Sequence, residues 1–220
     1  MTAFSLDVAN TLAGLLVLAS LLMLYQVRLP ALLNMLGLHA FILALAVAWQ
    51  AYAQGAPELY VTAVITLVFK AGLIPMALQR MVVRLGIHRE LEAVTGTGLT
   101  MLAGIGLVAL SLEVMLPVTA HADPLTREYI ALALSVVLLG LLMMVTRRNA
   151  VSQVAAFLSL ENGIDLAAAA AQGMPLVVEI SIAFSVLIAF LVIGVFLFRI
   201  RERFDTVDVR ALDEFRGERR

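Results

Sequence analysis

The sequence predicts an all-α polytopic membrane protein with seven transmembrane helices, its N-terminus outside and its C-terminus in the cytoplasm. The chain is 62% hydrophobic and only 14% charged, with a mean hydropathy of +1.01. A soluble domain is nearer about 45–50% apolar and about 25% charged. Seven segments reach the length of about 20 residues that a bilayer-spanning helix needs. Arginine gathers on one side of the resulting topology, as the positive-inside rule requires.

The expected spans follow one another with short connections that contain proline or glycine. They cover residues 5–27, 31–53, 58–80, 96–117, 128–146, 149–171 and 175–199. The first segment lacks the basic start of a signal peptide, so we expect it to be retained as a helix. Residues 81–95 form the longest expected inner loop. We divide the chain into a four-helix part, residues 1–127, a three-helix part, residues 128–199, and a cytoplasmic tail, residues 200–220.

Arginine sets the expected orientation. With seven spans, the inner side receives Arg28, Arg80, Arg84, Arg89, Arg147, Arg148 and the seven arginines from residue 199 onward. Of the other basic residues, Arg127 falls on the outer side and Lys70 falls within a span. This asymmetry places the N-terminus outside and depends on the number of spans, because losing one span would scramble it.

Two carboxylates, Glu161 and Asp165, lie in the sixth expected span. They are one helical turn apart and therefore share a face of the helix. A charged side chain at the centre of a bilayer costs about 2.5–3.5 kcal/mol on insertion scales. The pair predicts a proton or ion relay, either as two stations of one path or as two groups that share one proton. The alternative is that both are protonated and only hydrogen-bond neighbouring helices.

Lys70 lies near the middle of the third expected span, far from either membrane surface. Pro75, five residues on, removes a backbone donor, so we expect a kink beside the lysine. We interpret Lys70 as a relay residue. The alternative is a structural ion pair in which a carboxylate neutralises the lysine.

Three further residues complete the candidate relay: Glu179, His39 and Glu113. Glu179 and Glu113 lie within one turn of the outer ends of their spans, as exit stations or as solvated interfacial carboxylates. His39 lies in the cytoplasmic half of the second span, as a relay member or as a hydrogen-bonded packing residue. Asp7 and Glu58 are expected at the level of the lipid headgroups.

Cofactor sites are not expected in this chain. It has no cysteine, so it cannot hold an iron–sulfur cluster through thiolates or form a disulfide. Of its three histidines, only His39 falls within a span, which argues against a membrane haem held by two histidines. We expect no catalytic residue and no metal ligand here.

The C-terminal stretch, residues 130–217, resembles the three-helix subunit K of respiratory complex I. The matching features are Leu139-Gly140-Leu141, Arg147-Arg148-Asn149, Leu160-Glu161, Asp208 and Glu214-Phe215-Arg216-Gly217. In that family the glutamate of this helix is a proton-path residue, so the resemblance implies this role for Glu161. Two features depart from the family. The spacing from Asn149 to Glu161 is longer, and Phe184 and Ser185 stand where a second buried glutamate is expected.

The whole chain resembles component E of hydrogenase-4 and formate hydrogenlyase type complexes. The matching features are Asn10 with Leu12 to Leu15, Lys70 with Pro75, Arg148-Asn149, Glu161-Asn162-Gly163, Glu179-Ile180 and Val207-Asp208. The resemblance implies a non-catalytic subunit of an oxidoreductase complex in the inner membrane of a prokaryote. Its implied partners are antiporter-like membrane subunits and a peripheral redox arm with iron–sulfur clusters and often a nickel–iron centre. The implied function is to couple electron transfer to proton or sodium movement.

Other functions stay open at this point. The chain could be a structural scaffold subunit of such a complex or a stand-alone cation transporter. No inverted repeat with paired broken helices supports the transporter. A quinone-handling subunit would need an aromatic and histidine constellation that the sequence does not offer. We expect lipid and protein partners and no nucleic acid.

Overall fold

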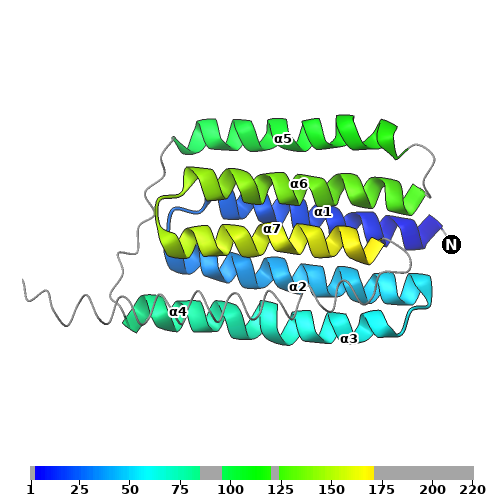
Figure 1. Cartoon of the computed structure of the whole chain (residues 1–220), viewed down its shortest axis with the longest axis horizontal. Coiled ribbons are helices and arrows are strands. Elements are labelled where there is room, and N and C mark those ends of the chain that lie inside the picture. Colours follow the sequence, from blue (N-terminus) through cyan, green and yellow to red (C-terminus); the bar gives the residue numbers. More distant parts are fainter. Residues whose placement is uncertain (1–2, 85–95, 120–123, 171–220) are drawn as a thin grey trace, which may run out of the picture.

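A computed structural model of the chain describes residues 3–84, 96–119 and 124–170. These residues form a single bundle in which each long helix runs antiparallel to the one before it in the chain (Figure 1). Their order is α1 (Ala3–Tyr25), α2 (Leu29–Gln54), α3 (Glu58–Ile65), η1 (Thr66–Leu73), α4 (Ile74–Arg84), α5 (Thr97–Val118), α6 (Pro124–Thr146) and α7 (Ala150–Ala170). The described residues contain no strand, and the all-α class is confirmed for them.

Five helices of the described part are long and apolar enough to cross a membrane, so the chain is a multi-pass membrane protein. They cover Phe4–Tyr25, Leu29–Gln54, Glu58–Val83, Thr97–Val118 and Thr126–Thr146, and correspond to the first five expected spans. The sixth expected span coincides with α7, which is not among these five helices because Glu161, Asn162 and Asp165 lower its mean hydropathy. The seventh expected span, residues 175–199, and the tail lie outside the described residues.

The third membrane helix is continuous from α3 through η1 to α4, and it differs from the expectation in two ways. It runs to Arg84, so the expected end at residue 80 and the loop start at Met81 are wrong by about one turn. Where a kink was expected beside Pro75, the residues just before the proline form a π-helix, η1, in which the Ile74 N–H donates to the Phe69 carbonyl. Because Pro75 has no N–H to donate to the carbonyl one turn back, a local change of helix type accommodates it.

Local capping explains where several helices begin and end. Pro30 lies in the first turn of α2, where its missing N–H is not needed, and Gly55 ends that helix with φ 65°. Asn149 Oδ1 accepts from the N–H of Val151 at 2.9 Å and so caps α7.

Arg147 ties α6 to the end of α1. Its Nη2 donates to the carbonyl oxygens of Leu24 at 2.8 Å and Gln26 at 2.6 Å. Burial lowers the pKa of this guanidinium, which nevertheless keeps its charge because arginine does not lose its proton in proteins. The charge therefore meets the carbonyl oxygens that a helix end leaves unpaired.

Charge is unequal at the two ends of the described bundle. The antiparallel order brings five arginines to one end, called here the arginine-rich end: Arg28, Arg80, Arg84, Arg147 and Arg148. The other end, called the acidic end, carries Asp7, Glu58, Glu113 and Glu128 together with Arg127.

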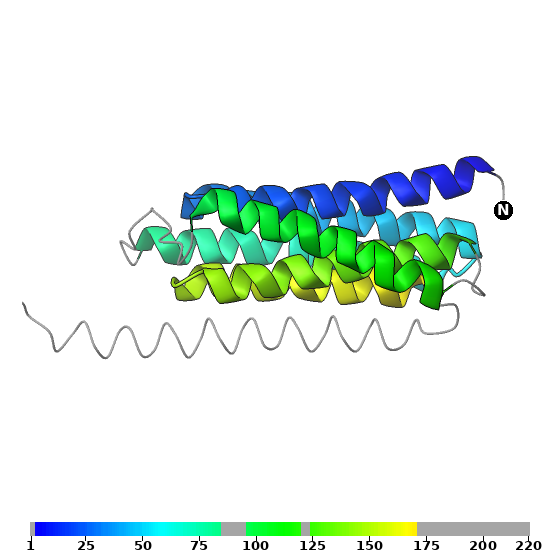
Figure 2. The same cartoon turned by 90° about the horizontal axis from the view of Figure 1, so that it is seen from above.

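The helices are unequally enclosed. Helix α7 packs on α6 and α2, and thirteen of its 21 residues are buried. Helix α5 packs mainly on α6 and lies at the outside of the described bundle, where it crosses α1 and α6 (Figures 1 and 2). The division expected at residue 127 falls in the first turn of α6, and helices from both parts share one hydrophobic core.

Candidate functional site

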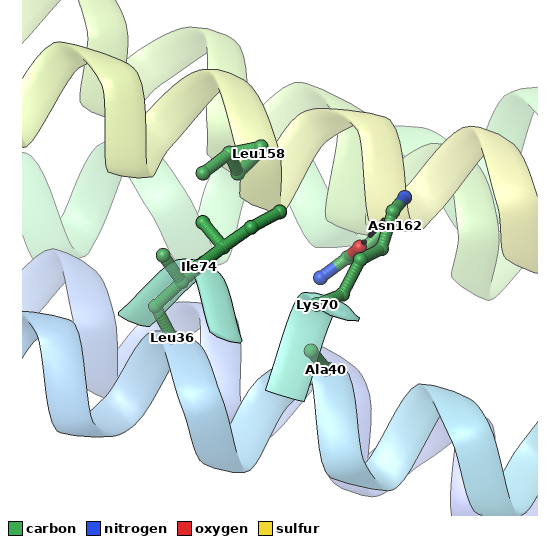
Figure 3. Close-up of a pocket in the computed structure, with 6 residues that line it drawn as sticks. All are labelled: Leu36, Ala40, Lys70, Ile74, Leu158 and Asn162. Atoms are coloured by element: carbon green, nitrogen blue, oxygen red, sulfur yellow. Dashed lines mark hydrogen bonds between the residues drawn. The ribbon is translucent and has the colours of Figure 1, made fainter. Parts of the chain in front are cut away.

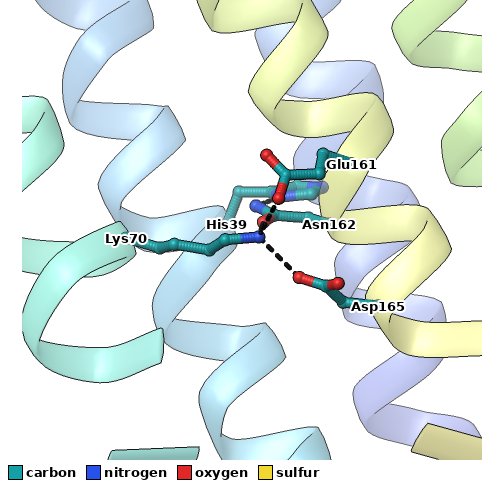
Figure 4. A network of polar contacts seen from close by, with 5 residues as sticks. All are labelled: His39, Lys70, Glu161, Asn162 and Asp165. Carbon is teal, nitrogen blue, oxygen red and sulfur yellow. Dashed lines mark hydrogen bonds and ion pairs between the residues drawn. The ribbon is translucent and has the colours of Figure 1, made fainter. Parts of the chain in front are cut away.

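The ammonium of Lys70 lies between two carboxylates in the middle of the bundle (Figure 4). Lys70 Nζ is 2.9 Å from Glu161 Oε1 and 2.5 Å from Asp165 Oδ2. The three residues are 3%, 5% and 1% exposed. The structure therefore brings together the three residues that the sequence singled out within the third and sixth spans, and we call them the Lys70 cluster.

Helix geometry explains how the cluster forms. Glu161 and Asp165 are one turn apart on α7, and both point at η1 (Figure 4). Lys70 lies inside the π-helical segment η1, and π-helical turns occur frequently at functional sites. On the other side of η1, Gly37 of α2 allows close approach, because a Cβ there would lie 3.2 Å from the Ala71 carbonyl oxygen.

A chain of hydrogen bonds leads from Lys70 through α7 to α2 and α1. Lys70 Nζ donates to Asn162 Oδ1 at 3.4 Å, and Asn162 Nδ2 lies 3.0 Å from His39 Nδ1. His39 Nε2 lies 2.8 Å from Ser20 Oγ, which itself donates to the Leu16 carbonyl. This order assigns the proton of the neutral His39 ring to Nε2, since Nδ1 must accept from Asn162.

The charges in the cluster do not balance as a simple ion pair. One ammonium faces two carboxylates, so full ionisation would leave a net charge of −1 in the centre of the bundle. An unbalanced buried charge is costly, and binding one proton or another small cation would remove it. When all three groups are ionised, the cluster therefore carries one carboxylate charge more than the lysine balances.

A small cavity lies beside the cluster, with room for about one water molecule (Figure 3). Lys70 and Asn162 line it on the polar side. Its remaining walls are the apolar side chains of Leu36, Ala40, Ile74 and Leu158.

The comparison with known proteins identifies a family. The chain is 33% identical over 206 residues to the uncharacterized protein Rv0085 of Mycobacterium tuberculosis, a stretch that covers 93% of this chain and 94% of that protein. This chain belongs to the Rv0085 family. No family model matches the sequence, and no solved structure matches it.

The structure places the remaining candidate residues of this Rv0085-family chain apart from the cluster's centre. His39 is fully buried one step away, behind Asn162. Glu113 is exposed on α5 near the acidic end and is not part of the cluster. Asp7 and Glu58 are exposed at the same end, at the ends of α1 and α3 where headgroup-level residues are expected. Glu179 lies outside the described residues.

Sequence reasoning did not assign Asn162, Thr62, Thr66, Gln50 or Tyr129 to the site of this Rv0085-family chain. All five are buried, and the last four lie between the cluster and the acidic end. One signal was present, since Thr62, Thr66 and Lys70 recur at every fourth position and so lie near one face of a helix. Within the described residues, no group of three or more histidine, aspartate or glutamate side chains could hold a metal ion.

Proposed function

We propose that this chain is a membrane-arm subunit of a multisubunit redox-driven ion pump, of the kind formed by membrane hydrogenases that resemble complex I. The Lys70 cluster would be part of its proton or sodium path. The observation that carries the proposal is one buried ammonium between two buried carboxylates, which leaves one positive charge to be bound and released. Ionisable residues at this depth are expensive to keep, and they mark ion pathways in membrane proteins.

The proposal places the N-terminus outside and the C-terminus in the cytoplasm of a prokaryotic inner membrane, with seven spans. The arginines gathered at one end of the described bundle support this orientation. The proposed partners are antiporter-like membrane subunits and a peripheral arm with iron–sulfur clusters, which in many such complexes also holds a nickel–iron centre. Support for these partners is the resemblance of the whole chain to component E of such complexes.

A second candidate function is a structural subunit of the same complex. One observation favours it: each carboxylate of the cluster contacts Lys70, and Lys70 also donates to Asn162, which contacts His39. A closed network of this kind can simply hold α2, η1 and α7 together. The two functions differ in whether the cluster must gain and lose a proton.

Replacing Glu161 separates the two candidates. The variant Glu161→Gln keeps the shape of the side chain and leaves Lys70 paired with Asp165, so we expect the complex to assemble normally. We expect the rate of ion uptake through this path to fall by about 100-fold, the lower range for loss of a positioned proton-transfer group. The measurement is dye-monitored ion uptake by inverted vesicles during turnover of the intact complex.

The matched control is Ile164→Val, on the same helix but with a side chain that is 48% exposed. It should leave both assembly and coupling unchanged. Normal coupling in an assembled Glu161→Gln complex would refute the relay role and favour the structural candidate.

A further inference from the structure

Along the third membrane helix, the buried face that carries Lys70 is polar towards the acidic end and apolar towards the arginine-rich end. Towards the acidic end, α3 and η1 present Thr62 and Thr66, which are 0% and 1% exposed. Gln50 of α2 and Tyr129 of α6 are both fully buried in the same half of the bundle. We call these four residues the polar half.

Several atoms of the polar half lack partners. Within the described structure, no hydrogen bond reaches Thr62 Oγ1, Thr66 Oγ1 or Gln50 Nε2, and Asp165 Oδ1 is also unpaired. The Tyr129 hydroxyl approaches the Gln50 amide without completing a hydrogen bond. Buried polar groups in native proteins almost always have a protein or water partner. We therefore expect water molecules beside these unpaired atoms.

The residues of the polar half lie at successive depths between the cluster and the acidic end. Gln50 and Thr62 stand at similar distances on either side of the connection between α2 and α3, and Thr66 follows one turn nearer to Lys70. Gln54, one turn beyond Gln50, donates to the Ala169 carbonyl of α7 at 2.8 Å. Ala169 is one turn beyond Asp165 on α7, so this contact links α2 to α7 between the cluster and the acidic end.

Where α2, η1 and α7 meet, the wall of the cluster facing the arginine-rich end is apolar. On the side of α1, the hydrogen bonds from Asn162 through His39 to Ser20 run towards the same end. Ile74 continues the buried face of Thr62, Thr66 and Lys70, and it is 3% exposed. Together with Leu36 and Leu158 it lines the small cavity beside Lys70 (Figure 3). We call these three residues the apolar seal, because none of their side chains can replace the water molecules that hydrate an ion.

We propose that water occupies the polar half and connects the Lys70 cluster to the acidic end, while the apolar seal closes the cluster to hydrated ions along η1, towards the arginine-rich end. The cluster then exchanges its proton or cation with the acidic side in the described conformation, and movement of a cation along η1 to the other side requires the seal to open. This inference deepens the proposed function by naming the side that loads the site. Its test measures water access alone and does not depend on turnover.

The absence of cysteine from the sequence makes the test direct. Single variants Thr66→Cys and Ile74→Cys place a thiol on the same buried face, one turn to either side of Lys70. Native membranes carrying the intact protein are exposed to Ag⁺ in nitrate buffer, and the remaining thiols are counted with a fluorescent maleimide after denaturation. We expect Thr66→Cys to react at least about tenfold faster than Ile74→Cys, because a cation crosses an apolar barrier poorly.

Three controls make each outcome decisive. Val64→Cys, 59% exposed on the outer face of α3, reports any reaction that does not need the internal path. Glu58→Cys marks the acidic end, so vesicles of both orientations show from which side Thr66→Cys reacts. Thr62→Cys repeats the test one turn away in case Thr66→Cys does not fold.

Reaction of Thr66→Cys or Thr62→Cys only from the side that labels Glu58→Cys supports the proposal. The proposal is overturned if Thr66→Cys and Ile74→Cys are protected from Ag⁺ as fully as Val64→Cys is. Rapid reaction of Ile74→Cys from the arginine-rich end overturns it as well. If water reaches Thr66→Cys but Glu161→Gln leaves ion coupling intact, the water path stands and the translocation function fails.

Discussion

The ammonium of Lys70 is the positive charge that both carboxylates of the cluster share. Both carboxylates of α7 point at its ammonium, and all three side chains are buried. Removing one member of a buried ion pair leaves an uncompensated charge, whereas removing all members together can be nearly neutral. The cluster therefore predicts strong dependence of the three residues on one another.

We expect Lys70→Met to lower the free energy of unfolding by about 3–5 kcal/mol, because two carboxylates lose their cation. The triple variant Lys70→Met, Glu161→Gln, Asp165→Asn should recover most of this loss. The measurement is thermal unfolding in detergent for the wild type, the single variant and the triple variant. Equal stability of Lys70→Met and wild type would mean that the carboxylates do not rely on the lysine.

At the scale of the helices, contact between α6 and α7 fixes where the carboxylates lie. A Cβ on Gly140 would lie 2.7 Å from Leu160 Cβ and 2.8 Å from the Leu160 backbone. A Cβ on Gly163 would lie 2.9 Å from the backbone nitrogen of Val137. Gly163 directly follows Asn162, so this close approach sets the position of the helix that carries the cluster.

We expect Gly140→Ala and Gly163→Ala each to destabilise the protein by about 1–3 kcal/mol, the usual cost of overpacking. The added methyl group meets backbone atoms, which cannot turn away as a flexible side chain can. Gly14→Ala and Gly106→Ala are the matched controls, since a Cβ at either position has no neighbour within 4 Å.

Thermal unfolding in detergent compares the four glycine variants. In the controls alanine should be neutral or stabilising, by up to about 1 kcal/mol in a helix interior. Destabilisation of all four variants to the same degree would show that the α6–α7 approach does not set the effect.

At the scale of the whole molecule, the described bundle combines a polar centre with an apolar exterior. Helix α5 leaves large apolar side chains exposed along its length, among them Leu99, Leu102 and Ile105. Such a surface suits the bilayer and neighbouring membrane subunits equally, because helix association in lipid depends on packing.

Purification of the tagged chain in mild detergent, followed by mass identification and iron analysis, tests the proposed assembly. We expect antiporter-like subunits and an iron-containing peripheral arm in stoichiometric amounts. A lone or homo-oligomeric protein would contradict the redox-complex proposal and put a stand-alone transporter first.

Much of this architecture follows from the sequence by itself. Apolar segments of bilayer length predicted five spans that the structure contains as candidate membrane helices, and α7 matches the sixth. The spacing of Glu161 and Asp165 predicted a shared helix face, because helical periodicity is a local property of the chain. The burial of Lys70 was predicted from its position near the middle of the third expected span.

Only the tertiary structure decided which of these residues meet. Residues 70 and 161 are far apart along the chain, and no local pattern states that η1 lies opposite α7. The structure also showed that Glu113 is exposed and that Asn162 links Lys70 to His39. The physical reason is that depth and helix face come from local periodicity, whereas the pairing of faces depends on how glycines and proline let particular helices approach.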